Sequence, residues 1–364
     1  MESVDLDLFN NFFKGKKVLI TGHTGFKGSW ISIWLKQLGA TVYGYSLPPD
    51  AGNNNYTTTN LESKTISVYG DILEKNKLQD FFLLHKPDIA LHMAAQPLVL
   101  ESYKNPDYTF EVNVQGTVNF LEAVRKSKSV KAAVVISSDK CYQNNEWVWG
   151  YRENDSMGGD DPYSASKGCT ELVTQSYIKS FFKKDSSCAV ASARAGNVIG
   201  GGDWAENRIV PDFYRALLNK QKISVRNPLA TRPWQFVLEP LFGYLKLTEK
   251  LYLEGFRYGS AWNFGPSEKS YSVEVLISEL IKVAGLAESI FVHEKPENSP
   301  HEAHSLRLDI SKASQYLGWK SVLDFERCVK FTHESYMNTG FSDRVNQIAA
   351  YVKIEKEKIN RIYG

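Results

Sequence analysis

One stretch of the sequence decides the fold: Thr21-Gly22-His23-Thr24-Gly25-Phe26-Lys27-Gly28. A short aliphatic run precedes it, and an apolar helical pattern starts directly after it at Trp30. In a strand, glycine turn and helix of this kind, the first glycine permits the tight turn and the second lets backbone approach a pyrophosphate. The third lets the helix lie close to the sheet. The stretch therefore predicts a dinucleotide site, with a purely structural glycine turn as the alternative.

The first half of the chain repeats this alternation of short aliphatic runs with longer helical patterns, which is typical of βαβ units around a parallel sheet. Strands are predicted at residues 17–21, 41–45, 66–69, 89–92, 132–137 and 189–193, and helices at residues 26–38, 73–85, 106–126 and 162–182. We therefore expect an α/β fold in which residues 1–195 form a Rossmann-type, doubly wound parallel sheet that binds the cofactor.

The second half of the chain has a looser pattern, in which loops rich in glycine, proline, asparagine and tryptophan separate the elements. Helical patterns remain at residues 238–253, 273–283 and 325–337. We expect residues 196–340 to form a smaller C-terminal α/β lobe for the substrate, with some of this chain returning to the first sheet. Residues 341–364 predict a helical tail that docks on the body or on a partner subunit.

Composition limits the classes of partner. The 43 Lys and Arg residues nearly balance the 41 Asp and Glu residues, which leaves a formal charge of +2 over 364 residues. No bulk field would draw such a chain to nucleic acid or to an anionic membrane, so any bound anion needs a local site. No apolar run approaches the roughly 18 to 20 residues that span a bilayer, and the acidic N-terminus is unlike a signal peptide. We expect a soluble, cytoplasmic protein.

The four cysteines are scattered, with no C-x-x-C pair, which argues against a disulfide framework and against a zinc site. No metal site is expected.

Further cofactor positions follow from the ends of the next strands. The second strand ends at Tyr45 and Ser46 without the acidic residue that usually holds the adenosine ribose, and no arginine cluster awaits a 2′-phosphate, so NAD and NADP both remain open. Asp71 and Ile72 follow the third strand, where an Asp often meets the adenine edge, although a helix N-cap is an equal alternative. Small residues end the fourth strand, so backbone could pass close to cofactor and substrate: Ala94 and Ala95, followed by Gln96.

A catalytic pair is predicted at the start of the helix at residues 162–182. Tyr163 and Lys167 are four residues apart and therefore project from one helix face. A free tyrosine has a pKa of about 10, and a nearby ammonium favours the phenolate. Tyr163 could then take a proton from a sugar or alcohol hydroxyl near neutral pH. The alternative, an ordinary solvated helix start, loses weight because the glycine turn lies upstream in the same α/β chain.

Three polar residues, Ser138, Asp139 and Lys140, follow the fifth predicted strand. Ligands of open parallel sheets bind at the carboxyl ends of the strands, so these side chains should face the reacting centre. Ser138 would complete a serine, tyrosine and lysine triad by hydrogen-bonding the reacting hydroxyl. Asp139 and Lys140 would add an acid and a base, which simple hydride transfer does not need. A loop N-cap and a surface lysine are the alternative.

The chain resembles the CDP-glucose 4,6-dehydratase family of extended short-chain dehydrogenases. Five stretches carry the resemblance, over roughly residues 14–336: the glycine turn, Ser137-Ser138-Asp139-Lys140-Cys141-Tyr142, Pro162-Tyr163-Ser164-Ala165-Ser166-Lys167, Arg194-Ala195-Gly196-Asn197 and Thr231-Arg232-Pro233-Trp234. The resemblance implies NAD as cofactor and conversion of CDP-glucose to CDP-4-keto-6-deoxyglucose and water, a hydro-lyase step in deoxysugar biosynthesis such as that for lipopolysaccharide O-antigen. Hydride removed from C4 would return to C6, so no external reductant would be consumed.

The resemblance also implies roles for single residues. Tyr163 would take the proton of the 4-hydroxyl, Asp139 would be the acid for the leaving 6-hydroxyl, and Lys140 would be either the base at C5 or an electrostatic group. Lys140 could abstract the C5 proton only if it were neutral. The substrate-binding residues implied, beside Gln96 and Ser138, are Asn197, Arg208, Arg232 and His301. The two arginines are candidates for the pyrophosphate, and a surface salt bridge is the alternative for each.

The resemblance finally implies a homodimer, paired through a four-helix bundle built from the helices at residues 106–126 and 162–182. Two other functions share the glycine turn and the Tyr163 and Lys167 pair: a nucleotide-sugar epimerase, and a non-catalytic redox-sensing protein that binds NAD(P).

Overall fold

The computed structural model describes residues 6–183, 186–286, 291–293 and 306–363. Its centre is a seven-stranded sheet in the order β11-β6-β5-β4-β1-β2-β3, in which every neighbouring pair is parallel. The strands are β1 Lys17–Thr21, β2 Thr41–Ser46, β3 Ile66–Tyr69, β4 Ile89–His92, β5 Ala132–Ile136, β6 Ala189–Arg194 and β11 Ala261–Asn263. The chain order reverses between β1 and β4, which is the switch point where such sheets bind ligands.

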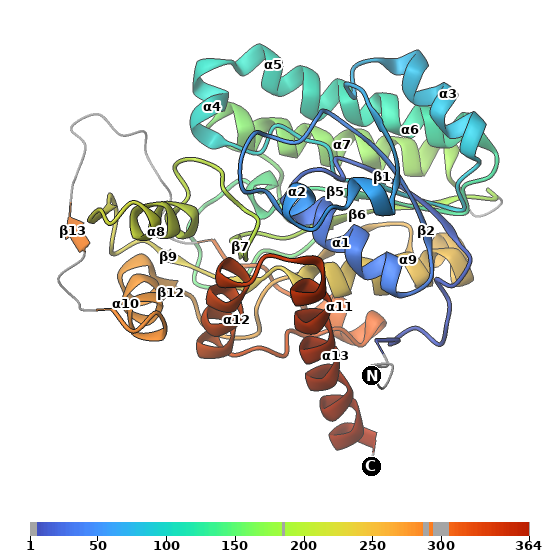
Figure 1. Ribbon diagram of the computed structural model, residues 1–364. Coiled ribbons are helices and arrows are strands. Elements are labelled where there is room, and N and C mark those ends of the chain that lie inside the picture. Colours follow the sequence, from blue (N-terminus) through green and yellow to red (C-terminus); the bar gives the residue numbers. More distant parts are fainter. Residues whose placement is uncertain (1–5, 184–185, 287–290, 294–305, 364) are drawn as a thin grey trace.

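Helices cover both faces of the sheet (Figure 1). One layer contains α3 Lys75–His85, α4 Val99–Lys104, α5 Pro106–Phe110, α6 Gly116–Ser127 and α7 Pro162–Phe181. The opposite side carries α1 Phe26–Gln37, α9 Leu238–Glu254 and the C-terminal α13 Phe341–Tyr363. Successive residues of a strand face opposite sides of the sheet and pack in two cores. Val18 and Ile20 pack in the first core, on the side of α1 and α9, and Leu19 packs in the second core, on the side of α6 and α7.

The predicted Rossmann-type fold is confirmed, and the six predicted strands appear within one residue of their expected ends. The helix expected at residues 106–126 differs, because a π-helical turn, η2 Glu111–Gln115, separates α5 from α6. This wide turn aims Asn113 inward, where its amide accepts a hydrogen bond from the Gln96 backbone N–H and donates one to Ser166 Oγ. A π-turn inside a helix often marks such a functional position.

The second half of the chain adds three two-stranded sheets: β7 Val198–Ile199 with β10 Gln235–Phe236, β9 Thr231–Arg232 with β12 Tyr271–Ser272, and β8 Ile223–Val225 with β13 Phe291–His293. Its remaining helices are α8 Ile209–Leu218, α10 Val273–Val283, α11 Ser311–Leu317 and α12 Phe325–Met337. The short elements α2 Asn55–Thr58, η1 Glu62–Lys64, η3 Asp139–Cys141 and η4 Gly255–Tyr258 lie between the larger ones. Since β11 joins the large sheet, part of this half does return to it.

The C-terminal tail docks on the body of the chain. Helix α13 packs on α1, where the Tyr351 ring meets Trp34 edge-on at 5.9 Å between centroids. The Tyr351 hydroxyl donates a hydrogen bond to the buried carboxylate of Glu239 on α9, at 3.1 Å. Among the residues that the structure describes, no helix combines the length and apolarity that crossing a membrane requires.

Candidate functional site

The glycine turn lies where β1 meets α1, at the switch point of the sheet. Gly22 has φ +74°, and a Cβ there would lie 2.6 Å from the Ala94 backbone N, so this position requires glycine. A Cβ on Gly28 would overlap the Gly22 carbonyl oxygen. A Cβ on Gly25, in contrast, would meet nothing nearer than the Gly22 oxygen at 3.4 Å. The exposed side of Gly25, at the positive end of α1, is therefore open to a ligand and fits the pyrophosphate of a dinucleotide.

Several predicted cofactor residues support this turn from behind. The His23 ring is fully buried, its Nδ1 lies 3.0 Å from Ser46 Oγ, and burial lowers the pKa of His23 to about 4, so the ring carries no charge at neutral pH. Ser46 also lies 3.0 Å from Thr24 Oγ1. Tyr45 points into the second core and donates to the Asp71 carbonyl oxygen at 3.0 Å. Both side chains are packed inside the protein, so binding of the cofactor by His23 and Tyr45 stays a prediction that concerns their backbone atoms.

The two residues after β3 have local partners as well. Asp71 Oδ1 accepts the Leu73 backbone N–H at 2.9 Å, so the capping alternative holds for this oxygen. Ile72 is buried and packs under Gly116, where a Cβ would come within 2.8 Å of it. Contact of Asp71 with an adenine edge stays a prediction.

Ser138, Asp139, Lys140, Tyr163 and Lys167 form what we call the catalytic corner. β5 ends just before Ser138, whose side chain caps η3 by accepting the Lys140 backbone N–H at 3.2 Å. η3 packs on the start of α7, which brings Tyr163 and Lys167 to the same place. The Ser138 hydroxyl donates to Asp139 Oδ1 at 3.0 Å, and it lies close enough to Tyr163 to lower the pKa of that phenol. The structure thus unites the residues that the sequence placed on two separate elements.

Asp139 is held by the segment that follows β6. A Cβ on Gly196 would overlap the Asp139 carboxylate, so that carboxylate lies directly against the Gly196 backbone. Asn197 has φ +51°, an uncommon conformation for a residue other than glycine, and its amide donates to Asp139 Oδ2 at 3.4 Å. Sequence reasoning expected Asn197 on the substrate, whereas the structure shows its amide on the predicted acid.

Burial dominates the electrostatics of the corner. It raises the pKa of Tyr163 to about 12, and the nearby Ser138 hydroxyl and the charge of Arg208 oppose that rise. Burial also lowers the pKa of Lys167 to about 8. In the chain without cofactor, desolvation is therefore the largest influence on both groups, and activation of Tyr163 by Lys167 stays a prediction.

Lys27 links the glycine turn to the catalytic corner. Its ammonium lies 3.5 Å from the Tyr244 hydroxyl on α9, and burial together with the charge of Arg208 lowers the pKa of Lys27 to about 8, while Asp139 opposes that shift. Tyr244 is fully buried, and Asp139 contributes to the raised pKa of its phenol. Sequence reasoning missed Tyr244 because one tyrosine in an apolar helix carries no signal that it faces a site.

The predicted substrate residues lie in different surroundings. The Gln96 amide donates to Thr109 Oγ1 at 2.7 Å and accepts the Leu98 N–H at 2.5 Å, so it braces the loop after β4, and its contact with a substrate stays a prediction. Arg208 pairs with Asp203 at 2.8 Å, close enough to Tyr163 to affect its pKa. Arg232 is buried on β9 and donates to the Thr231 carbonyl oxygen. His301 lies outside the described residues.

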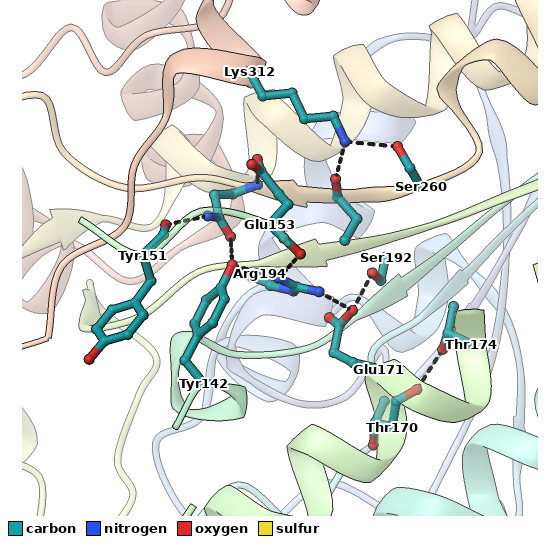
Figure 2. A network of polar contacts seen from close by, with 12 residues as sticks. Tyr142, Tyr151, Glu153, Thr170, Glu171, Thr174, Ser192, Arg194, Ser260 and Lys312 are labelled. Atoms are coloured by element: carbon teal, nitrogen blue, oxygen red, sulfur yellow. Dashed lines mark hydrogen bonds and ion pairs between the residues drawn. The ribbon is translucent and has the colours of Figure 1, made fainter. Parts of the chain in front are cut away.

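A buried polar network fixes α7 from the other side (Figure 2). Glu171, one turn after Lys167, accepts Arg194 at 2.8 Å and Ser192 Oγ at 2.7 Å, and both members of the ion pair are fully buried. The Arg194 guanidinium lies over the Tyr142 ring, 4.9 Å from its centroid. The network therefore ties α7 to β6 and to the loop after β5, and it holds the helix that carries Tyr163.

Comparison with known proteins agrees with this geometry. Residues 19–332 match the family model described as GDP-mannose 4,6 dehydratase. A CDP-glucose 4,6-dehydratase from Salmonella typhimurium is 49% identical over 314 residues, covering 85% of this chain and 87% of that protein.

Solved structures share the fold. A dTDP-glucose 4,6-dehydratase from Streptomyces venezuelae, with NAD bound, has a TM-score of 0.75 at 22% identity and covers 88% of this chain and 97% of that one. A UDP-glucose 4-epimerase from Thermotoga maritima, with UDP-glucose, has a TM-score of 0.75 at 23% identity and covers 88% of this chain and 98% of that one. On the family model and the curated relative, the chain belongs to the GDP-mannose 4,6 dehydratase family of extended short-chain dehydrogenases.

Proposed function

We propose that this protein is an NAD-dependent hydro-lyase that converts CDP-glucose to CDP-4-keto-6-deoxyglucose and water in deoxysugar biosynthesis. The observation that carries the proposal is the buried group beside the glycine turn, in which Ser138 donates to Asp139 and both residues influence the pKa of Tyr163. Epimerases and simple dehydrogenases need only the base that takes the hydroxyl proton. They do not need an additional acid such as Asp139 beside it. The 49% identity to a CDP-glucose 4,6-dehydratase supports the choice of substrate.

The glycine turn fits NAD, because the open side of Gly25 faces the N-terminus of α1 and Lys27 adds local positive charge. When bound, NAD supplies a hydride acceptor that later returns the hydride, and its oxidised ring adds positive charge. Tyr163 takes the proton of the sugar 4-hydroxyl, Ser138 orients that hydroxyl, and the charge of Lys167 favours the phenolate. Burial raises the pKa of Tyr163 to about 12, so this step requires positive charge near the phenol to lower it.

Water loss falls to Asp139 and Lys140. Once C4 is a ketone, the C5 proton is acidic, and a base can remove it as an acid protonates the departing 6-oxygen. Asp139 is the acid in this proposal, buried and held in place by Ser138 and Asn197. Lys140 is half-buried on η3 beside Asp139, and either proton abstraction or electrostatic stabilisation of the enolate suits this position.

Incubation of the pure protein with CDP-glucose tests the proposal. We expect the alkaline-sensitive chromophore of a 4-keto-6-deoxy sugar and no net change in NADH. Asp139→Asn and Lys140→Ala should each lower the rate of water loss about 100-fold or more, while NADH still accumulates in a single turnover. Formation of CDP-galactose would instead indicate an epimerase, and the absence of turnover with any nucleotide sugar would indicate a binding protein.

We also propose a homodimer that forms through α5 and α7. Large apolar side chains are exposed on this layer: Tyr108 and Phe110 on α5, and Leu172 and Phe181 on α7. Leu172 is 56% exposed and Phe181 50%, which favours a covering partner over water. Leu172→Glu should shift the mass in light scattering from dimer to monomer, and Leu253→Glu on α9, 64% exposed, is the matched control.

The division into residues 1–195, 196–340 and 341–364, the cytoplasmic location and the role in surface polysaccharide remain parts of this proposal. Contact of Arg208, Arg232, Asn197 and His301 with the nucleotide sugar also belongs to it. Arg208 lies near Tyr163, so it is placed better for contact with the sugar of the ligand than for contact with a distant phosphate.

A further inference from the structure

The proposed reaction moves one proton permanently, and the catalytic corner contains a path for it. As the C4–O–H group becomes C4=O, its hydride leaves C4 and its proton leaves oxygen. The base that removes the C5 proton later returns one to C5, and the hydride ends on C6. The C6–O bond breaks with its electron pair on oxygen, and that hydroxide needs one proton to leave as water. Over the whole cycle, the 4-hydroxyl proton therefore balances the proton gained by the 6-oxygen.

Resting on the proposed function, we propose that Ser138 relays this proton from Tyr163 to Asp139, so that the proton taken from the 4-oxygen is delivered to the 6-oxygen without passing through solvent. The Ser138 hydroxyl lies beside both groups: it donates to Asp139 Oδ1 at 3.0 Å, and η3, which it caps, packs on α7 so that Ser138 lowers the pKa of the Tyr163 phenol. A hydroxyl has one proton to donate and can accept another, which is what a relay requires.

Each transfer in this relay returns the groups to their starting state. Tyr163 begins as phenolate and accepts the 4-hydroxyl proton. It then donates to Ser138 Oγ while the Ser138 proton moves to the Asp139 carboxylate, which restores the phenolate and leaves Asp139 as a neutral acid. Asp139 protonates the leaving 6-oxygen and becomes a carboxylate again. Without this path, Tyr163 would have to lose a proton to water and Asp139 would have to gain one from water.

Burial favours the internal path over exchange with water. Tyr163 is 8% exposed, Ser138 6% and Asp139 3%. Two further contacts keep the carboxylate against Ser138: the Gly196 backbone lies directly on it, and the Asn197 amide donates to its other oxygen at 3.4 Å. Gly196 and Asn197 are therefore positioning residues that keep the acceptor within reach of the serine.

A single turnover of the NAD-loaded enzyme with CDP-glucose, in weak buffer with a pH indicator, tests the relay. NADH absorbance and ketosugar formation follow the chemistry in the same sample. The wild-type protein should show no proton transient between NADH formation and water loss. Ser138→Ala should show a transient of up to about one proton per active site, because Tyr163 and Asp139 then exchange protons with water.

Two variants separate the relay from a general defect. Ser138→Thr keeps the hydroxyl and should show no transient. Gly196→Ala keeps all three relay side chains but displaces the Asp139 carboxylate, and it should show the same transient as Ser138→Ala. As an independent measurement, the rate of water loss should be determined at several deuterium fractions of the solvent. The plot of rate against deuterium fraction should be curved for the wild-type protein and linear for Ser138→Ala.

The outcomes distinguish the two proposals. If ketosugar forms and the wild-type protein itself shows the proton transient, the relay is wrong while the dehydratase stands. If Ser138→Ala turns over without a transient, the relay is also wrong. If CDP-glucose yields no ketosugar, the proposed function is wrong and the relay falls with it, because no proton then leaves a 4-hydroxyl.

Discussion

The glycine turn and the catalytic corner meet at one edge of the sheet but are built in opposite ways. In the turn, side chains are missing so that backbone atoms can approach each other, as Gly22 approaches Ala94. In the corner, ionisable side chains are crowded together with few contacts to water, as Asp139 and Lys167 are 3% and 4% exposed. The turn therefore depends on volume, whereas the corner depends on charge compensation, and substitutions should separate the two.

The largest effect is expected behind the corner. Glu171→Gln leaves the fully buried Arg194 without its carboxylate partner and should lower the free energy of unfolding by about 3 to 5 kcal/mol. Denaturant unfolding measures this loss. Glu254→Gln, which breaks a partly exposed pair with Lys250, is the control and should cost no more than about 0.5 kcal/mol. Equal losses in the two variants would show that charge compensation does not set the stability of the corner.

The next effect concerns volume in the turn. Gly28→Ala places a Cβ on the Gly22 carbonyl oxygen and should cost about 1 to 3 kcal/mol of stability as well as NAD binding. Gly25→Ala should change stability by no more than about 0.5 kcal/mol, because its nearest contact is 3.4 Å away. It should still weaken NAD binding about tenfold or more by filling the open side, as calorimetric titration would show. Unchanged binding in Gly25→Ala would place the pyrophosphate elsewhere.

A smaller effect should distinguish the corner by its pH dependence. The pKa of Lys167 is lowered from 10.5 to about 8 on folding, so the unfolded chain binds more protons between these values. The contribution of Lys167 to the free energy of unfolding therefore rises as pH increases from about 8 to about 10.5, by at most about 3 kcal/mol. Subtracting the Lys167→Met curve from the wild-type curve, both without NAD, isolates this rise. A flat difference would mean that Lys167 is hydrated in the folded protein.

The smallest effect tests the support behind the turn. Ser46→Ala removes contacts of Ser46 Oγ with His23 Nδ1 and Thr24 Oγ1, both at 3.0 Å. Thermal unfolding should show a loss of about 1 kcal/mol. Leu47→Ala at the neighbouring position, which is 49% exposed, is the control and should be nearly neutral. A larger loss in the control would indicate that packing, and not hydrogen bonding, holds this strand end.

Local patterns were enough to predict most of the fold. The alternation of short apolar runs and helical patterns located β1 to β6 and α7, because strand and helix periodicities are properties of consecutive residues. The spacing of four residues likewise placed Tyr163 and Lys167 on one helix face, and both are buried at the corner. The π-turn at Asn113 was not predicted, because it arises from hydrogen bonds to distant Gln96 and Ser166.

Within the site, the sequence predicted which residues lie nearby better than it predicted where their side chains point. Tyr45 ends a strand beside the turn as expected, but its side chain enters the second core, since strand residues alternate between faces. Gln96 was expected on the substrate, yet Thr109 and Leu98 occupy its amide. Such partners come from other loops, and no spacing in the sequence encodes them.

The sequence by itself determined the parallel α/β fold, the glycine turn and the identities of the reacting groups, because each depends on patterns of residues that are close together in the chain. Only the tertiary structure decided that Ser138 and Asp139 are brought close to Tyr163 and that the Asp139 carboxylate lies against the Gly196 backbone. These contacts exist because β6 pairs beside β5 and α7 packs over η3, so loops far apart in the chain converge at one edge of the sheet. The same convergence removes water, and burial then sets the pKa values of Tyr163 and Lys167.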